Sequence, residues 1–378
     1  MKVLCGQLID GTGAALRDVV LEIDEASVVG VRGEVEGEPD LVDWSEFTVL
    51  PGLVDCHDHL TINMGDGEVE ARQSDAWRAI KGAANARTML KSGITLLRSA
   101  SEKHNLGAPL REAIDSGVIP GPRLALAGEC IVATGGHGWF LGIESDGVEA
   151  VRHAVRQQLK AGVDFVKMIV SGGVTTPGGT LVRSCFTYPE IEAAVDEAHR
   201  GGKPITVHAY GGEAASDSIR AGVDAIDHGT YLTDADLDTM ADKGTWLVST
   251  VSVMRAASEA PHVRPFMRER FKKVADDYIA TLERARSRGL KVVVGCDTHH
   301  ASVAEEISAL VDAGYSPMEA IIAGTARGAE FCQVGDRIGK LLPRYQADLI
   351  AVRGDPLADI RALGRVAAVV KAGVTQNL

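Results

Sequence analysis

The stretch Pro51-Gly52-Leu53-Val54-Asp55-Cys56-His57-Asp58-His59 is an apolar run that ends in two imidazoles two positions apart. Because side chains alternate between the two faces of a strand, His57 and His59 point the same way, and one divalent metal ion can bind both. A His-x-His pair alone is weak evidence, since such pairs more commonly lie on surface strands. The positions of the other candidate ligands therefore decide the weight of this hypothesis.

The other candidate ligands share one position relative to the predicted strands. Each lies at or near the carboxyl end of a short apolar run. Barrel enzymes place their chemistry at the carboxyl ends of their strands, so side chains from distant parts of the chain are expected to meet there. These candidates are Lys167, His208, His228 and Asp297.

Between about residues 47 and 334 the sequence repeats a β-branched run, a polar loop and an amphipathic helical stretch. This rhythm is typical of successive βα units. Eight candidate strands predict an α/β fold with a closed (β/α)8 TIM-like barrel. The expected strands are residues 49–55, 94–99, 123–127, 165–170, 204–208, 225–228, 246–250 and 292–296. The expected helices include residues 74–92, 147–161, 188–201 and 263–288.

The two ends of the chain alternate like short strands and do not follow the βα rhythm. We therefore predict a small β-sandwich domain assembled from residues 1–48 and 339–378. Residues 49–338 between them are predicted to form the metal-dependent (β/α)8 barrel, which is the catalytic domain. A chain of 378 residues is long enough for both parts.

The composition, with 45% hydrophobic and 24% charged residues, is typical of a globular α/β enzyme. The net charge of -13 and the lack of a basic stripe disfavour a nucleic-acid partner. No stretch approaches a bilayer-spanning length and the first residues do not resemble a signal peptide, so we expect no membrane partner and a cytoplasmic location. The six cysteines lack CxxC spacing, which argues against disulfides and a thiolate zinc site.

Two divalent metal ions about 3.5 to 4 Å apart can share a bridging hydroxide, which supplies a nucleophile near neutral pH. Histidine and carboxylate ligands suit zinc or a similar ion. A protonated lysine cannot bind a cation, so Lys167 fits only if carbon dioxide has converted its amine to a carbamate that bridges both ions. The alternative is that Lys167 is an ordinary lysine, which caps a barrel strand and pairs with a carboxylate.

Asp297 can serve as a metal ligand and as the base that moves a proton from water to the leaving amine. Its alternative role is the N-cap of a helix at residues 302–310. His299 lies too close to Asp297 to be assigned. Solvated surface roles are expected for the remaining histidines His104, His153, His199, His262 and His300.

Two glycine-rich loops are expected near the same end of the barrel. Residues 134–139 follow the third strand, and their glycines would let the backbone fold over the site with His137 pointing inward, unless the segment is only a flexible turn. Residues 171–179 lack the Gly-Lys-Ser/Thr ending of a P-loop, so we expect a lid over the substrate and no nucleotide site.

With these residues in place, the chain resembles the amidohydrolase superfamily over nearly its whole length. The run that ends at His59 matches the first-strand motif of that superfamily, and the four further ligands match its fourth, fifth, sixth and eighth strands in order. Residues 347–356 look like its return to the β-sandwich. Residues 134–138, 165–174 and 228–231 look most like the prolidase and Xaa-Arg dipeptidase branch, beside imidazolonepropionase-like relatives.

The resemblance implies two metal ions on six side chains. One ion is held by His57, His59 and Asp297, the other by His208 and His228, and carboxylated Lys167 bridges them. It also implies that His137 and Tyr231 contact the scissile carbonyl or the carboxylate end of the substrate. Imidazolonepropionase itself uses a mononuclear site without the bridging lysine, so Lys167 argues against that activity.

The sequence thus predicts a metal-dependent amidohydrolase, with zinc as the expected metal, that cleaves the amide bond of a dipeptide or N-acyl amino acid. The alternative substrate is a non-peptide amide, carbamate, urea or lactone, because relatives with the same ligands hydrolyse such molecules. A non-catalytic scaffold is disfavoured because all six positions carry usable groups. The resemblance further implies a small-molecule substrate and a homo-oligomer.

Overall fold

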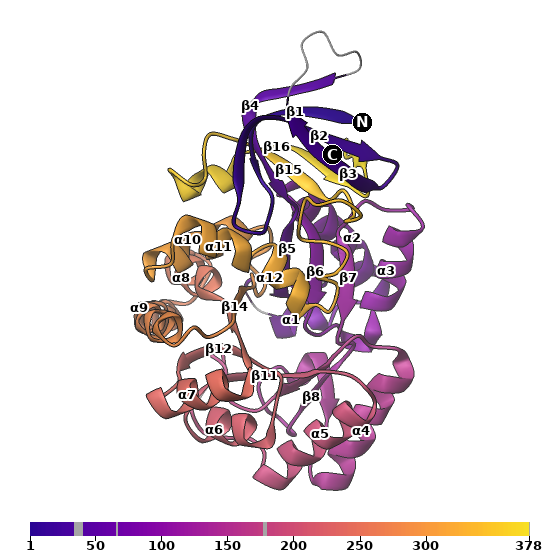
Figure 1. Cartoon of the computed structure of the whole chain (residues 1–378). Helices are drawn as coiled ribbons and strands as arrows, with labels where there is room; N and C mark the ends of the chain where they lie inside the picture. Colours follow the sequence, from indigo (N-terminus) through magenta and orange to yellow (C-terminus); the bar gives the residue numbers. More distant parts are fainter. Residues whose placement is uncertain (34–40, 66, 177–179, 378) are drawn as a thin grey trace.

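Parallel strands with helices outside them form the larger part of the chain in the computed structural model, which describes residues 1–33, 41–65, 67–176 and 180–377 (Figure 1). One arc pairs three strands in the order β5-β6-β7, and a second pairs seven in the order β14-β13-β12-β11-β10-β8-β9. The first arc comprises β5 (Leu53–Asp58), β6 (Ile94–Ser99) and β7 (Arg123–Leu126). The second comprises β8 (Cys130–Val132), β9 (Gly142–Glu144), β10 (Val166–Ile169), β11 (Ile205–Gly211), β12 (Ala225–Tyr231), β13 (Trp246–Ser249) and β14 (Val292–Val294).

Backbone hydrogen bonds join the two arcs at both of their edges. The N–H of Asp297, just after β14, donates to the carbonyl of His57 at 2.8 Å, and the N–H of Asp164 donates to the carbonyl of Leu126 at 2.8 Å. The strands therefore close on themselves, and the predicted TIM-like barrel is confirmed. Largely apolar side chains from the strands and the surrounding helices form the main core.

Two predicted strands differ from those observed. The expected strand at 49–55 is in fact divided between two sheets. Leu50 pairs with Ile350 in the sheet formed by the chain ends, and the barrel strand β5 begins only at Leu53. The third strand is divided into β7 and β8, with Gly128 (φ +70°) between them. The other six strands were placed to within a few residues.

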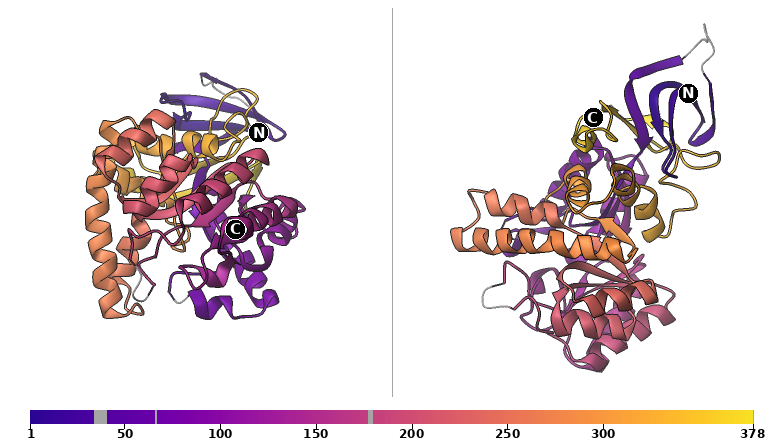
Figure 2. Two further views of the ribbon diagram at one scale, coloured as in Figure 1. Left: turned by 90° about the horizontal axis from the view of Figure 1, so that it is seen from below. Right: turned by 60° about the vertical axis from the view of Figure 1, so that its left-hand side comes forward.

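The helices lie outside the strands and alternate with them along the chain (Figures 1 and 2). Local signals explain where several begin: Ser74 accepts a bond from the N–H of Trp77, and Thr187 and Glu190 form a capping box. All four expected helices are confirmed. The helices are α1 (Gly67–Ala71), α2 (Asp75–Lys91), α3 (Gly107–Asp115), α4 (Val148–Ala161), α5 (Tyr188–Arg200), α6 (Gly212–Ala221), α7 (Asp234–Lys243), α8 (Val251–Glu259), α9 (Pro265–Ser287), α10 (Val303–Asp312), α11 (Pro317–Ala323) and α12 (Ala326–Phe331).

The two chain ends pair into one seven-stranded sheet, at the top of Figure 1, in the order β17-β16-β15-β4-β1-β2-β3. Strand β15 bonds antiparallel to β4 and thereby joins the ends, and the sheet has its own apolar core. Arg123 of the barrel pairs with buried Asp348 before β15. The strands are β1 (Lys2–Ile9), β2 (Ala15–Asp24), β3 (Ser27–Gly33), β4 (Leu41–Pro51), β15 (Leu349–Arg353), β16 (Val366–Lys371) and β17 (Val374–Thr375).

Candidate active site

Histidines from three strands and an aspartate after a fourth meet at the carboxyl ends of the barrel strands. Ligand atoms of His57, His59 and Asp297 all lie within 4.8 Å of one another, and Asp297 Oδ1 is 3.5 Å from Nε2 of each histidine. The ring centroid of His228 lies 5.2 Å from that of His57 and 4.4 Å from that of His208. The structure therefore brings five of the six predicted ligands into one continuous cluster.

The backbone departs from regular strand geometry at two of these residues. His228 has φ +75° and Asp297 has φ +45°, a left-handed region that costs a residue with a Cβ about 1 to 3 kcal/mol. At His228 the departure breaks the strand alternation, so that Asp227 and His228 are both buried and both approach His57. Two consecutive residues of β12 therefore both reach the same cluster.

Strand β14 lies unusually close to β5, which brings Asp297 to the two histidines. One carboxylate oxygen of buried Asp55 accepts bonds from the N–H groups of His57 and Cys296, each at 3.1 Å. A Cβ at Gly295 would lie 2.6 Å from the Cβ of His57, so only glycine permits this approach. Asp55 and Gly295 therefore fix the distance between the two ligand-bearing strands.

Lys167 joins the cluster through a carboxylate that sequence analysis missed. Its ammonium pairs with Asp227, whose Oδ2 also lies 3.0 Å from His57 Nδ1 and whose Oδ1 accepts a bond from the Thr206 hydroxyl at 2.9 Å. The unmodified side chain thus adopts the pairing that was considered as the alternative for an ordinary lysine. A carboxylate inside the apolar run that ends at His228 was the available signal for Asp227.

Burial keeps two histidines of the cluster, His208 and His228, and the neighbouring His137 neutral. It lowers the pKa of His228 to about 3 and that of His137 to about 4, and it holds the pKa of His208 well below its usual value. His228 Nδ1 lies 2.8 Å from the Thr250 hydroxyl, whereas its buried Nε2 has no hydrogen-bond partner among the described residues. Neutral rings with a free nitrogen are suited to bind a metal ion.

His59 and Asp297 form the charged part of the cluster. Burial lowers the pKa of His59, but hydrogen bonds to Asp297 outweigh this and raise it to about 8. Burial would likewise raise the pKa of Asp297, but His57 and His59 hold it well below its usual value. The carbonyl of Ser101 lies 3.0 Å from His59 Nδ1 and can only accept, so Nδ1 carries a hydrogen and Nε2 faces Asp297.

The donor set fits a divalent metal ion. Imidazole nitrogens and a carboxylate are the ligands that zinc prefers, and three of them already lie within bonding reach of one central point. The unpartnered Nε2 of His228 gives an independent indication, because a buried polar atom without a partner is costly unless a ligand completes it. On these two observations the residues of this chain fit the metal that their types suggest.

The loop at 134–139 folds over the cluster. The His137 ring lies 4.7 Å from that of His208, and its Nδ1 lies 2.8 Å from the hydroxyl of Thr176 in the expected lid. A Cβ at Gly173 would lie 2.3 Å from His137 Cε1, so a glycine is required where the lid crosses the ring. The last three residues of the expected lid, 177–179, lie outside the described residues.

Two tyrosines and one arginine complete the surroundings of the cluster. Tyr231 is partly buried, and burial raises its pKa to about 12. Tyr210 is buried and stacks on His228, with ring centroids 5.0 Å apart. Arg270 on α9 donates to the carbonyl of Thr176 at 3.5 Å. Tyr210 and Arg270 were missed, because Tyr210 is an ordinary aromatic in a strand and Arg270 lies on a helix far along the chain.

The structure corrects one expected surface role and excludes one alternative. His300 is largely buried, with Nδ1 2.9 Å from Asp58 and Nε2 3.0 Å from the carbonyl of Ile62, so its surface role was wrong. Asp297 does not cap a helix, because α10 begins after Ser302. His104, His153, His199 and His262 are exposed as expected, whereas His299 lies 3.8 Å from Glu305.

Comparison with known proteins identifies the family. Residues 48–375 match the model of the amidohydrolase family, and the chain therefore belongs to this family. It is 27% identical to ochratoxinase from Aspergillus niger over 95% of this chain and 82% of that protein.

Two solved structures resemble the whole chain. A Xaa-Pro dipeptidase with methionine bound in its active site has a TM-score of 0.90 and 30% identity over 99% of both chains. A prolidase complexed with N-methylphosphonate-L-proline has a TM-score of 0.91 and 26% identity over 99% of this chain and 98% of that one. Among the described residues, no helix combines the length and the low polarity needed to cross a membrane.

The lowered histidine pKa values predict how the stability of the metal-free protein depends on pH. Unfolded histidine titrates near 6.5, so between pH 6.5 and 5 the unfolded chain binds protons that His228 and His137 exclude when folded. Each of these two histidines should therefore lower the free energy of unfolding by about 2 kcal/mol as the pH falls through that range. His59 has a raised pKa, so its stabilising contribution is fully present below pH 6.5. That contribution is lost only as the pH rises through about 8.

Urea denaturation of chelator-treated protein at pH 7 and pH 5 measures this loss. The His228→Asn variant should lose less stability than the parent, and the His153→Asn control, altered at an exposed position, should match the parent. Equal losses in all three proteins would contradict the assignment of a neutral buried His228.

Proposed function

We propose that this protein is a binuclear metal-dependent hydrolase that cleaves the amide bond of a dipeptide or an N-acyl amino acid with a free carboxylate. Membership of the amidohydrolase family supports the reaction class. The observation that carries the proposal is the pair of neutral histidines, His208 and His228, beside an ionised Asp297. The buried Nε2 of His228 lacks a partner within the described part of the chain.

The six predicted ligands divide into two sets around this cluster. His57, His59 and Asp297 would hold one metal ion and His208 and His228 the other, with the carbamate of Lys167 between them. When bound, such ions lower the pKa of water and polarise a carbonyl group. Zinc is the metal that these ligands suit best.

Carbamate formation on Lys167 is compatible with its surroundings. The ammonium first loses one proton. The neutral amine then attacks carbon dioxide, a C–N bond forms as one C–O π pair moves onto oxygen, and a second proton leaves the nitrogen. Two protons are therefore released as the cationic side chain becomes an anionic one. The carbamate would then no longer pair with Asp227. Asp227 would keep His57 Nδ1 at 3.0 Å and the Thr206 hydroxyl at 2.9 Å, so the change does not leave that buried carboxylate without partners.

Asp297 is suited to move the proton of the reaction. Its pKa is held well below the usual value by its bonds to His57 and His59, so it is ionised at neutral pH and can accept a proton from the attacking water. As the water oxygen bonds to the carbonyl carbon and the C–N bond breaks, Asp297 delivers this proton to the departing nitrogen. The products are a carboxylic acid and an amine.

His137 is placed to bind the carbonyl oxygen of the substrate. The Thr176 hydroxyl oxygen accepts a bond from the N–H of Gly173 at 3.2 Å, so its own hydrogen can be donated to His137 Nδ1. In the neutral ring the remaining hydrogen then lies on Nε2, which can donate to a carbonyl oxygen. Tyr231 is proposed to contact the carboxylate end of the substrate.

Arg270 supplies the cation that a substrate carboxylate requires. It bonds to the same lid residue, Thr176, that contacts His137. Its charge also counteracts the rise in pKa of both Tyr210 and Tyr231. Amino acid and proline-like ligands in the two solved relatives carry a comparable acidic group, which supports the assignment. Apolar side chains beside these tyrosines, among them Val253, Met254 and Phe271, suit an apolar substrate side chain.

A second candidate keeps the same site but replaces the substrate with a non-peptide amide, carbamate, urea or lactone. The observation behind this alternative is the similarity to ochratoxinase over nearly the whole chain, because that relative is named for a substrate that is not a dipeptide. A panel that compares dipeptides and N-acyl amino acids with such molecules separates the two. We expect about two equivalents of metal per chain and faster hydrolysis of substrates with a free carboxylate. Turnover confined to non-peptide substrates would favour the second candidate, and metal-free protein with full activity would exclude both.

Removal of the Lys167 side chain should remove the proposed carbamate that would bridge the two metal ions. We expect Lys167→Ala to lower kcat/KM by about 100-fold or more, with partial rescue by short carboxylic acids that replace the carbamate. The control is Lys160→Ala, an exposed lysine on α4. Unchanged activity in Lys167→Ala, or a loss that no carboxylic acid restores in a folded protein, would contradict the carbamate.

Replacement of Arg270 should separate recognition of the carboxylate from the chemistry. Arg270→Met should raise KM for a dipeptide with a free carboxylate about 10-fold to 100-fold and leave its methyl ester nearly unaffected, because the lost bond is charge-assisted. Arg268→Met, two residues earlier on the same helix, is the matched control. If Arg270→Met raises KM equally for the dipeptide and for its methyl ester, Arg270 has only a structural role in the lid.

A further inference from the structure

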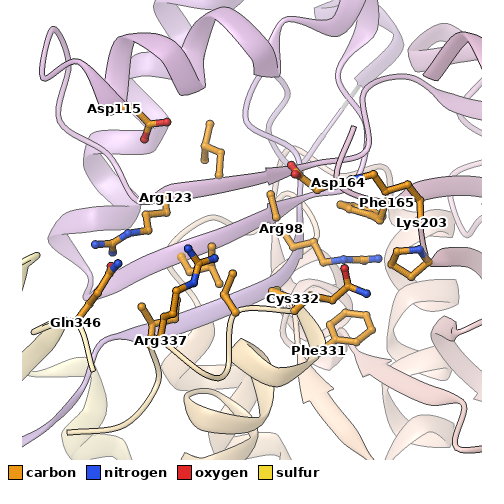
Figure 3. A pocket seen from close by; sticks show the side chains of 17 residues that line it. Arg98, Asp115, Arg123, Asp164, Phe165, Lys203, Phe331, Cys332, Arg337 and Gln346 are labelled. Atoms are coloured by element: carbon orange, nitrogen blue, oxygen red, sulfur yellow. The ribbon is translucent and has the colours of Figure 1, made fainter. Parts of the chain in front are cut away.

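A cavity of about 400 Å³ lies at the amino-terminal end of the barrel, opposite the candidate active site. It is lined by residues at the beginnings of strands, such as Arg123, Phe165 and Pro204, and by the segment that follows α12. Figure 3 shows side chains from these elements turned toward the same space. Nothing in the proposed reaction uses this end of the barrel.

Arg98 forms the polar centre of this cavity. Its side chain is 3% exposed, and its guanidinium carbon lies 3.3 Å from the ring centroid of Phe165 and 4.5 Å from that of Phe331. The two aromatic rings cover the guanidinium, so its N–H groups remain available only at the edge. Nη1 has no hydrogen-bond partner among the residues that the structure describes.

The known neighbours of Arg98 do not account for this unpartnered nitrogen. Asp227, deeper in the barrel, attracts the Arg98 charge, but no hydrogen bond joins the two side chains within the described chain. Burial of the guanidinium lowers the pKa of Arg98. A buried guanidinium N–H without an acceptor is costly, and an acceptor in the cavity would remove this cost.

Among the ionic side chains that line the cavity, cations outnumber carboxylates. The cations are Arg98, Arg123, Lys203 and Arg337, and the carboxylates are Asp115 and Asp164. Asp164 is already occupied by Arg111 at 2.7 Å and by the N–H of Leu126 at 2.8 Å. Over the described ranges of the chain, no ion pair involves Lys203, and the nearest carboxylate of Arg337 is its exposed neighbour Asp336 at 3.8 Å. Lys203 and Arg337 therefore remain available, together with Arg98, for an anion.

The remaining walls of the cavity are apolar. Leu96, Leu124, Val334 and Ile338 line it beside the two phenylalanines, and the volume is that of a small-molecule site. A planar carboxylate matches the exposed edge of a stacked guanidinium, because the two can form parallel hydrogen bonds. Inorganic phosphate would leave the apolar walls uncovered.

We propose that this cavity is a second ligand site, which binds a small organic carboxylate with an apolar or aromatic body. The carboxylate accepts hydrogen bonds from Arg98, and Lys203 or Arg337 contributes a second cation at the opening. The apolar body lies against Phe331 and the neighbouring aliphatic side chains. This site is independent of the proposed reaction at the other end of the barrel.

Crystals of the metal-loaded protein soaked with 4-bromophenylacetate test the proposal, because the anomalous signal of bromine locates each bound molecule. A bromine peak in the cavity, with the carboxylate toward Arg98, is expected. A peak confined to the metal cluster, or no peak, would overturn the proposal. The location of the peak also keeps this test separate from the proposed function.

Calorimetry in solution gives the second measurement. Phenylacetate should bind at least 10-fold more weakly to Arg98→Met, and phenylacetamide and inorganic phosphate should bind more weakly than phenylacetate to the parent. If Arg98→Met does not fold, the double variant Lys203→Met with Arg337→Met decides, since both side chains lie at the opening. Binding that is unchanged in the folded variants, or phosphate bound more tightly than phenylacetate, would contradict the assignment.

Discussion

The buried carboxylate of Asp227 organises the centre of the barrel. Burial would raise its pKa, but Lys167 and His57 hold that pKa well below its usual value, so a full negative charge lies inside the protein. Loss of both partners would leave an uncompensated buried charge, which costs about 3 to 5 kcal/mol. If Lys167 is carboxylated, His57 and the Thr206 hydroxyl remain as partners of Asp227. Lys167, His57 and the strand that carries His228 are thereby held in a single arrangement.

The cluster of candidate ligands follows from this constraint and from barrel closure. Asp55 and Gly295 bring the strand before Asp297 against the strand of His57. The backbone of His228 is left-handed, and both His228 and Asp227 approach His57. Burial then keeps His208 and His228 neutral, while Asp297 stays ionised next to His59. Imidazoles and one carboxylate gathered in a largely buried position are what the proposed chemistry requires.

The sequence allowed the barrel and the positions of the candidate ligands to be predicted, because both depend on local patterns. Strand ends can be recognised from apolar runs, and the fold brings those ends together. Tyr210, Arg270 and Arg98 could not be assigned, because their importance comes from contacts across the barrel between residues far apart in the chain. The first strand was misplaced because Leu50 and Pro51 are equally apolar but pair with the sheet formed by the chain ends.

Diffraction at the zinc absorption edge, from crystals of the metal-loaded protein, tests the central claim most directly. The account predicts two anomalous peaks, one among His57, His59 and Asp297 and the other between His208 and His228, with density for a carbamate extending from Lys167. The absence of both peaks, with Lys167 still paired to Asp227 in the presence of excess zinc, would contradict it.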